Sequence, residues 1–228
     1  VVLSRGLGDV YKRQELLSEA CREYNIHLIA DEIAVGFGRT GTMFGFQQAK
    51  ITPDIICLSK GITGGYMTLS TILTTDDIYD AFYDEYEKLN AFLHSHSYTA
   101  NPIACSAANA TLDIFKDKDV IKKNRILSAH MRRCFESLKE HPHVSDVRQK
   151  GMVLAIELIK DKKRKVSYDW KERRGIRAYL HGLKNNVLMR PLGNVLYFMP
   201  PYVITKKEIS FVSEIMKEGV DEATKKNS

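Results

Sequence analysis

The sequence lacks any long apolar run. No stretch of its 228 residues approaches the roughly 18 consecutive apolar residues of a membrane-spanning helix, so we do not expect a membrane protein. No secretory or organellar signal stands out at the amino terminus. Hydrophobic residues make up 44% of the chain and charged residues 27%, which is typical of a soluble globular protein with a sizeable core. We therefore expect a cytoplasmic protein.

Cysteine is scarce, and no two cysteines form a C-x-x-C pair. The four are Cys21, Cys57, Cys105 and Cys134. Their wide separation argues against a disulfide framework and against a zinc site, and it favours a reducing compartment. His94 and His96 have the spacing of two metal ligands on a strand, but no acidic residue or cysteine accompanies them in a suitable arrangement. We predict no metal site.

The chain carries a formal net charge of +6, which raises the alternative of a basic, non-catalytic binding module. Part of this charge lies in residues 1–14, which show neither the alternation of a strand nor the apolar face of a helix. We interpret these residues as a non-native leader. The basic run 160–165 contains Asp161 and no aromatic residue, so it is typical of a solvated loop. We predict no nucleic-acid partner.

Hydrophobic periodicity predicts an α/β fold for the first half of the chain. The expected elements are a helix at 15–24, buried strands at 26–33, 54–59 and 69–73, and helical segments at 76–89 and 103–141. Helices and short apolar strands in this succession favour a mostly parallel sheet covered by helices. Ligands of such sheets bind at the carboxyl ends of the strands.

The pattern changes near residue 118. The elements expected beyond it are a hairpin at 147–159, a helix at 170–184, short strands at 187–190 and 195–199, and a final helix at 206–223. We therefore predict that residues 15–117 belong to a large sheet domain and that residues 118–228 form a smaller α+β domain.

Asp31 and Lys60 lie at the ends of two of the expected strands, and glycines follow both. A carboxylate and an amine so placed suit a lysine that holds an aldehyde cofactor and an acid that pairs with its pyridinium nitrogen. We expect Lys60 to be partly desolvated, which would favour its neutral amine. Period-two geometry puts Ile33 on the same strand face as Asp31, suitably placed to lie against a ring. The alternatives are a plain strand-end turn acid and a surface lysine.

Residues Gly36–Gly41 match the dinucleotide-binding pattern G-x-G-x-x-G. That fingerprint requires the glycines to open a helix directly after a strand, with an acidic residue near the end of the next strand. Here the acidic Asp31 and Glu32 precede the glycines, and residues 42–45 make a poor first helical turn. We reject dinucleotide binding.

Two further segments offer groups that bind anions. Residues 97–102 form a hydroxyl-rich turn ahead of a helix, which could donate to a phosphate or could simply cap that helix. Arg190 ends an apolar strand and precedes Pro191, so it suits bidentate capture of a carboxylate or is an ordinary edge-strand arginine.

Together these segments resemble the class III aminotransferases, which are pyridoxal-phosphate enzymes of fold type I. The general resemblance is carried by Leu28–Ile33 with Gly36–Gly41, and by Ser59–Gly61 with Gly64–Gly65. A narrower resemblance is to the aminotransferases of biotin biosynthesis. It is carried by residues 64–70, 94–105, 189–193 and 197–202. The likeness begins near residue 15 and reaches the final helix, and it implies the carboxyl-terminal part of a fold type I enzyme.

The resemblance implies roles for individual residues. Lys60 would bind the aldehyde of pyridoxal 5'-phosphate covalently and carry the proton that moves during transfer. Asp31 would keep the pyridine nitrogen protonated, with Ile33 against the ring. Ser97 would reach the cofactor phosphate of the other subunit in a homodimer, where many family members have threonine.

For the substrate, the resemblance implies that Arg190 binds the carboxylate of the keto acid and that Tyr197 lines the site. The expected reaction is transamination of 8-amino-7-oxononanoate to 7,8-diaminononanoate, with S-adenosylmethionine as the amino donor and lysine as an alternative donor. Another class III ω-aminotransferase, acting on ornithine, γ-aminobutyrate or a diamine, is the alternative within the class. The amino-terminal half of the family pattern is absent from this sequence, so we expect the chain alone to be a fragment with little or no activity.

Overall fold

The computed structural model describes residues 7–94 and 96–225. Its contacts divide the chain into two compact units, Val1–Ile121 and Lys122–Ser228, and each is described by itself below. The division falls inside a helix, just beyond the expected domain boundary at residues 117 and 118, and our domain limits stay a prediction. Across the described ranges, no helix combines the length and the apolar character needed to cross a membrane.

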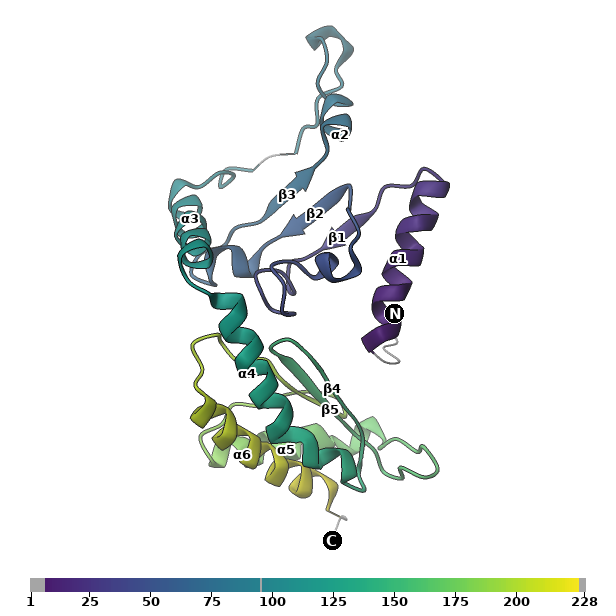
Figure 1. Ribbon diagram of the computed structural model, residues 1–228, viewed down its shortest axis with the longest axis vertical. Coiled ribbons are helices and arrows are strands. Elements are labelled where there is room, and N and C mark those ends of the chain that lie inside the picture. Colours follow the sequence, from purple (N-terminus) through teal and green to yellow (C-terminus); the bar gives the residue numbers. More distant parts are fainter. Residues whose placement is uncertain (1–6, 95, 226–228) are drawn as a thin grey trace. The chain divides into compact units, whose positions relative to one another are not determined.

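The first unit contains a three-stranded sheet with helices around it (Figure 1). Its elements are α1 (Leu7–Glu23), β1 (Ile29–Asp31), η1 (Gly45–Ala49), β2 (Ile55–Leu58), η2 (Lys60–Thr63), β3 (Thr71–Thr74), α2 (Asp76–Asp80), η3 (Tyr86–Lys88) and α3 (Pro102–Asp117). Strand β2 is central: β1 pairs with it in parallel, with Asp31 opposite Cys57, and β3 pairs with it antiparallel. The Asp54 carboxylate accepts the N–H of Leu28 at 2.6 Å, which fixes the start of β2 beside β1.

Two helices of this unit differ from the expectation. Helix α1 begins at Leu7, so residues 7–14 of the expected leader lie in its first turns, and residues 1–6 lie outside the described part of the chain. The leader assignment stays a prediction. The helix expected over residues 76–89 is wrong, because α2 ends at Asp80. Beyond it the Asp84 carboxylate accepts from the Glu85 N–H and from Lys88, and such local bonds compete with helical ones.

The core of the first unit is small. Phe37, Leu58, Ile62 and Ala108 form it, so the loop after β1, strand β2, η2 and helix α3 pack together. The expectation of fully buried strands is wrong: Ile29 is 59% exposed and Ile72 is 65% exposed. These residues lie on β1 and β3, which are the two edges of the described sheet, and no other described strand covers those edges.

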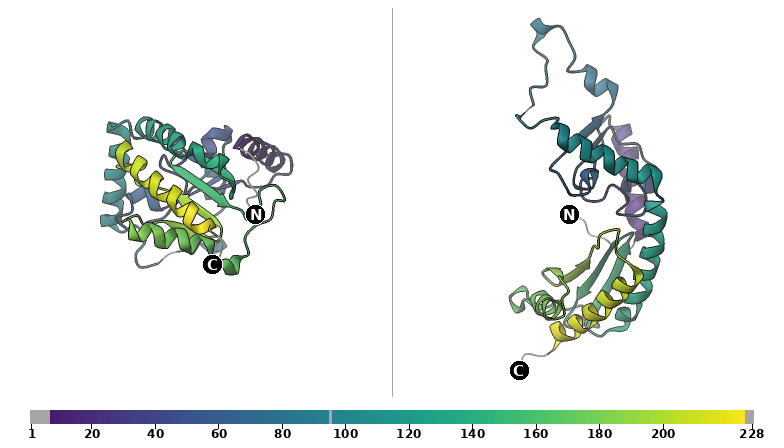
Figure 2. Two further views of the ribbon diagram at one scale, coloured as in Figure 1. Left: turned by 90° about the horizontal axis from the view of Figure 1, so that it is seen from below. Right: turned by 90° about the vertical axis from the view of Figure 1, so that its left-hand side faces the viewer.

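The second unit is an antiparallel sheet covered by helices, as expected for an α+β domain. Its elements are α4 (Val120–Phe135), η4 (Glu136–Glu140), β4 (Val144–Lys150), β5 (Val153–Leu158), η5 (Trp170–Glu172), α5 (Arg174–Lys184), β6 (Arg190–Leu192), β7 (Val195–Phe198) and α6 (Lys206–Thr224). The strand order is β4-β5-β7-β6. Alternate residues of β5, namely Leu154, Ile156 and Leu158, are buried against apolar side chains of α4, α5 and α6. Figure 2 shows the ribbons of these helices beside the sheet.

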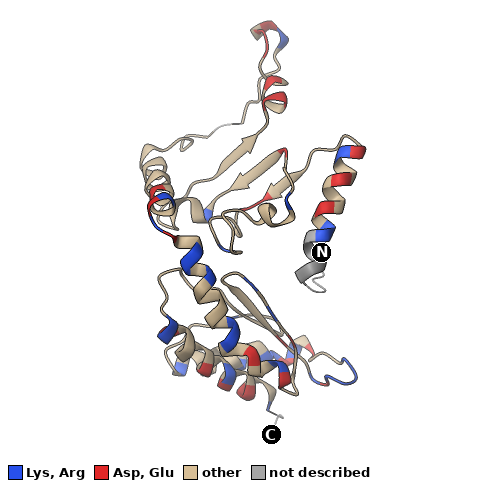
Figure 3. Ribbon diagram, in the orientation of Figure 1, with Lys and Arg blue, Asp and Glu red and all other residues tan. Residues whose placement is uncertain are grey.

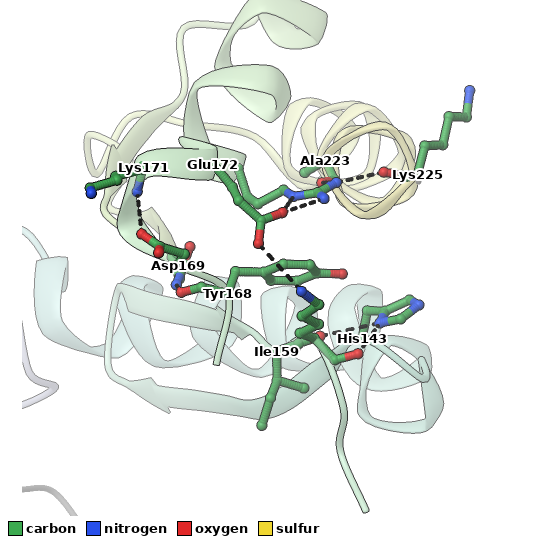
Figure 4. Close-up of polar contacts among 11 residues, drawn as sticks. His143, Ile159, Tyr168, Asp169, Lys171, Glu172, Ala223 and Lys225 are labelled. Carbon is green, nitrogen blue, oxygen red and sulfur yellow. Dashed lines mark hydrogen bonds and ion pairs between the residues drawn. The ribbon is translucent and has the colours of Figure 1, made fainter. Parts of the chain in front are cut away.

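Arg174 connects the start of α5 to the end of α6. It is 5% exposed, it pairs with the Glu172 carboxylate at 2.5 Å, and it donates to the carbonyl oxygens of Ala223 and Lys225. Figure 4 labels these three partners. Its guanidinium carbon lies 4.6 Å from the centroid of the Tyr168 ring. Because the last carbonyl groups of a helix have no intrahelical partner, Arg174 acts as a buried cap of α6.

Glycine lets α5 approach the β6–β7 turn closely. A Cβ atom on Gly175 would overlap the Gly193 carbonyl oxygen and lie 2.6 Å from Cβ of Pro191. A Cβ on Gly182, two turns later, would lie 2.6 Å from the Val187 carbonyl oxygen. The segment that carries Arg190 is therefore held against α5 by two positions that have no room for a side chain.

The basic run after β5 lies in a loop that makes local contacts. Asp161 accepts the N–H of Arg164 at 2.9 Å, and Lys162 donates to the carbonyl oxygen of Lys139. Figure 3 shows this loop mostly in blue, while α6 carries both acidic and basic residues. The arrangement agrees with the predicted solvated loop.

Candidate active site

Asp31 and Lys60 lie at the same edge of the first sheet. Asp31 is the last residue of β1, and Lys60 opens η2 directly after β2, the parallel neighbour of β1. The main-chain N–H of the next residue, Glu32, still donates to the Cys57 carbonyl oxygen at 3.0 Å, so the pairing continues past Asp31. The structure thus brings together an acid and an amine at the carboxyl ends of two parallel strands, where α/β sheets bind ligands.

The turn that carries Lys60 is held by hydroxyl groups. Ser59 donates to the Leu69 carbonyl oxygen at 2.7 Å, and Thr63, which is buried, donates to the Met67 carbonyl oxygen at 2.6 Å. Lys60 itself has φ of +44°, in the left-handed region that side chains other than glycine rarely adopt. Such a conformation persists when surrounding contacts fix it, and these residues supply some of those contacts.

The expected desolvation of Lys60 is wrong for this chain, because Lys60 is exposed. Lys60 opens η2 after the strand pairing of β2 has ended at Leu58, so its side chain lies outside the paired sheet. Asp31 is exposed as well.

The expectation that Ile33 shares a strand face with Asp31 is also wrong. Strand β1 ends at Asp31, and Ile33 lies in the turn that follows, half-buried. Its N–H donates to the Asp31 carboxylate at 3.0 Å. The link between the two residues is this main-chain hydrogen bond, since the period-two geometry of a strand does not extend to Ile33.

The glycine loop after β1 does not open a helix. Turns occupy residues 33–40, and the next element is the short 3-10 helix η1. The Gly36 N–H donates to the Glu32 carbonyl oxygen at 2.9 Å, so the chain turns sharply at once. This local structure lacks the long helix whose amino terminus binds a pyrophosphate, in agreement with our rejection of dinucleotide binding.

Glu32 is the residue that the sequence reasoning missed. It is 3% exposed, and its carboxylate accepts the N–H groups of Gly45 at 2.8 Å and Phe46 at 2.9 Å. The far end of the glycine loop is thereby fixed to the residue that follows Asp31. An available signal was the alternation of the strand, which turns Glu32 away from the side of Asp31 and into the protein.

Ser97 lies apart from these residues, in the segment that projects from the sheet between β3 and α3 (Figures 1 and 2). It is exposed and opens a turn held by the His96 N–H, which donates to the Thr99 hydroxyl at 3.2 Å. The cap of α3 is Asn101, whose side chain accepts the Ile103 N–H at 3.0 Å. The alternative that the turn of residues 97–102 caps this helix is therefore confirmed through Asn101, and Ser97 itself does not cap it.

Arg190 and Tyr197 lie in the second unit, where the structure places them opposite each other. They are register partners of the β6–β7 ladder, and the guanidinium carbon lies 5.9 Å from the ring centroid. Arg190 is exposed and Tyr197 is half-buried. Tyr197 also borders a cavity of about 400 Å³, whose wall is mostly apolar and includes Met189, Phe198 and Phe211.

Comparison with known proteins identifies the family. The model of the family "Aminotransferase class-III" matches residues 8–220. The chain is 47% identical over 219 residues to adenosylmethionine-8-amino-7-oxononanoate aminotransferase of Helicobacter pylori, with 94% of this chain and 48% of that protein covered. The matched range includes residues 8–14, which the sequence analysis set apart.

Solved structures agree. The crystal structure of adenosylmethionine-8-amino-7-oxononanoate aminotransferase from Methanocaldococcus jannaschii is 42% identical, with a TM-score of 0.87 over 91% of this chain and 48% of that one. The ω-transaminase of Pseudomonas jessenii in complex with PMP is 28% identical, with a TM-score of 0.87 over 92% of this chain and 46% of that one. These neighbours confirm the fold type I α/β fold.

The chain spans about half the length of the relatives it matches. The family match covers most of the chain and both of its units. It confirms the resemblance that the motifs around Asp31 and Lys60 indicated. This chain belongs to the class III aminotransferases.

Proposed function

We propose that the enzyme to which this chain contributes transfers an amino group to 8-amino-7-oxononanoate, with pyridoxal 5'-phosphate as cofactor and S-adenosylmethionine as donor. The observation that carries the proposal is the placement of Asp31 and Lys60 at the ends of adjacent parallel strands. The relatives named as adenosylmethionine-8-amino-7-oxononanoate aminotransferases, at 36–47% identity, support the choice of substrates.

The residues of the first unit fit the cofactor. The exposed amine of Lys60 is available to bind an aldehyde, and the Asp31 carboxylate one strand away is available to a protonated ring nitrogen. When bound, pyridoxal phosphate supplies an electron sink for the α-carbon of the amino donor. Lys60 would then move the proton from that carbon, and Asp31 would hold the proton at the pyridine nitrogen. Ile33, linked to Asp31 by its N–H, would lie near the ring.

The second unit would bind the acceptor. Arg190 carries a planar guanidinium, which suits bidentate hydrogen bonding to the carboxylate at the end of the keto acid. The Tyr197 ring lies beside that guanidinium and would limit its orientations. The charge of the substrate tail would thus be bound at one fixed place, which orients the rest of the molecule.

We also propose that the whole enzyme is a homodimer in the cytoplasm. The segment that carries Ser97 exposes a group of large apolar side chains, among them Phe82, Tyr86, Leu89 and Leu93. Exposed apolar groups of this extent are typical of surfaces that contact another protein. In a dimer, the Ser97 hydroxyl would donate to the cofactor phosphate of the partner subunit.

The experiment joins this chain to the amino-terminal half of the Helicobacter pylori relative and assays amino transfer to 8-amino-7-oxononanoate. We expect turnover with S-adenosylmethionine, cofactor absorbance from the lysine-bound form, and loss of both in Lys60→Ala. Lysine as the donor is the comparison arm. A chimera that binds the cofactor yet never aminates this acceptor would refute the substrate assignment.

The chain alone is expected to show little or no activity, since its half of the site is exposed to water. Turnover by the isolated chain would contradict that expectation. A second candidate is an ω-aminotransferase for ornithine, γ-aminobutyrate or a diamine, which the similarity to the Pseudomonas jessenii ω-transaminase favours. The same chimera, assayed with these substrates, separates the two functions. A non-catalytic basic module would instead bind its partner equally well in Lys60→Ala.

A further inference from the structure

Glu32 links the end of β1 to β2 and to the start of η1, although no role in the candidate site was predicted for it. Its main chain pairs with β2 through the Cys57 carbonyl oxygen, and its buried carboxylate accepts two N–H groups from the start of η1. Hydrogen bonds from amides to an ionised acceptor are among the stronger ones in proteins. One side chain thus fixes both the strand end and the far end of the glycine loop.

Two glycines pack closely against Glu32. A Cβ on Gly45 would lie 3.2 Å from Oε1 of Glu32, and a Cβ on Gly36 would lie 2.8 Å from its carbonyl oxygen. Gly36 at the start of the glycine loop and Gly45, the first residue of η1 after it, therefore approach Glu32 as closely as a residue without a side chain allows.

That loop carries Phe37, which packs against the turn of Lys60. Phe37 is 3% exposed, and a Cβ on Gly61 would lie 3.0 Å from its side chain. Phe37 has φ of +56° and Lys60 has φ of +44°. Left-handed backbone at a residue other than glycine is unfavourable, and it persists where the surroundings impose it. Phe37, one of the two residues with positive φ, makes the contact with Gly61, and Lys60, the other, directly precedes Gly61.

We propose that Glu32 is a positioning residue for Lys60. Its carboxylate holds the glycine loop, the loop presses Phe37 onto Gly61, and this contact keeps the backbone of Lys60 in its left-handed conformation. Lys60 therefore projects from a fixed backbone even though its side chain is exposed. The role of Lys60 as the cofactor-binding lysine rests on the proposed function. The coupling between the Glu32 carboxylate and the backbone of Lys60 is a property of this chain.

The first test uses amide hydrogen exchange on the chain as it is. The N–H groups of Ile62 and Gly64 donate within the turn of Lys60, to the carbonyl oxygens of Ser59 and Gly61. In Glu32→Gln we expect exchange to accelerate about tenfold at Gly45 and Phe46, and by a similar factor at Ile62 and Gly64. Acceleration confined to Gly45 and Phe46 would overturn the proposal.

The matched control is Gln47→Ala. It removes another side-chain acceptor from the same loop, because Gln47 accepts the Phe44 N–H at 3.0 Å, but that bond is exposed. We expect no change at Ile62 and Gly64. If the control accelerates them as strongly as Glu32→Gln, general loosening of the loop explains the effect and the role of Glu32 is refuted.

The second test reads the position of Lys60 chemically. The chain is incubated with pyridoxal phosphate, reduced with borohydride and digested, and the label at Lys60 is compared with that at Lys50, another exposed lysine with positive φ. We expect preferential labelling of Lys60 in the parent and a several-fold loss of that preference in Glu32→Gln. An unchanged preference overturns the positioning role. A parent without any preference, combined with coupled exchange, would contradict the proposed function and leave the coupling supported.

Discussion

Arg190 and Tyr197 are register partners of an antiparallel ladder, with the guanidinium carbon 5.9 Å from the ring centroid. The strand pairing fixes which ring lies beside the arginine, and α5, packed through Gly175, supports the turn between them. The proposed carboxylate-binding group is therefore held by strand pairing, although Arg190 itself is exposed.

Replacing Arg190 with lysine should weaken binding of the keto acid in the chimeric enzyme. A lysine retains the charge but loses the planar pair of donors, so we expect KM for the acceptor to rise about 10-fold to 100-fold. The half-reaction with the amino donor should keep its rate. Steady-state kinetics with each substrate varied in turn measure both effects. An equal loss in both half-reactions would mean that Arg190 does not bind the acceptor specifically.

Replacing Lys60 with glycine should separate stability from function. Glycine adopts φ of +44° without strain. We therefore expect the free energy of unfolding of Lys60→Gly to exceed that of Lys60→Ala by up to about 1 kcal/mol. Neither variant should bind pyridoxal phosphate covalently at position 60. Denaturant unfolding of the first unit gives the difference. Equal stability of the two variants would show that the backbone at Lys60 relaxes freely.

Replacing Gly175 with alanine should destabilise the second unit. The new methyl group would overlap the Gly193 carbonyl oxygen and Cβ of Pro191, both parts of a packed turn, so we expect a loss of about 1–3 kcal/mol. Gly193→Ala is the control: it has open space around it and pays only for its φ of +58°, about 1 kcal/mol. Fluorescence of Trp170, the single tryptophan, follows unfolding of this unit. A smaller loss in Gly175→Ala than in Gly193→Ala would contradict the close packing.

Acid should destabilise the second unit through Glu172. The hydrogen bond from Arg174 lowers the pKa of Glu172 below its ordinary value of 4.5. A carboxyl group with a lowered pKa in the folded state contributes stability above about pH 4.5, and this contribution is lost as the pH falls through the folded value. Unfolding measured by Trp170 fluorescence between pH 6 and pH 3 should therefore show a steeper decline in the parent than in Glu172→Gln. Parallel curves would exclude the ion pair as the cause.

The sequence predicted those parts of the site that depend on strand ends. Asp31 and Lys60 could be placed because parallel strands bring their carboxyl ends to one edge, and the apolar runs that precede both residues are short and clear. Arg190 and Tyr197 could be named from the family motif, but their pairing required the register of β6 and β7, which follows from the turn at Gly193.

Other features depended on contacts that no local pattern encodes. The exposure of Lys60 is a property of the folded turn after β2, and the early end of α2 follows from the bonds of Asp84 to nearby residues. In the sequence, Glu32 is an acidic residue next to Asp31, and nothing in the local pattern gives it a role of its own. Its burial and its two amide donors, thirteen and fourteen residues further along the chain, become apparent only in the folded structure.

The two edges of the first sheet affect the self-association of this chain in solution. Strands β1 and β3 each present a row of main-chain N–H and C=O groups with no described strand beside them, and Ile29 and Ile72 add apolar area along those rows. Open edges of this kind pair readily with strands of other molecules. Copies of this chain would therefore add to one another edge to edge, so its solubility should fall steeply with concentration.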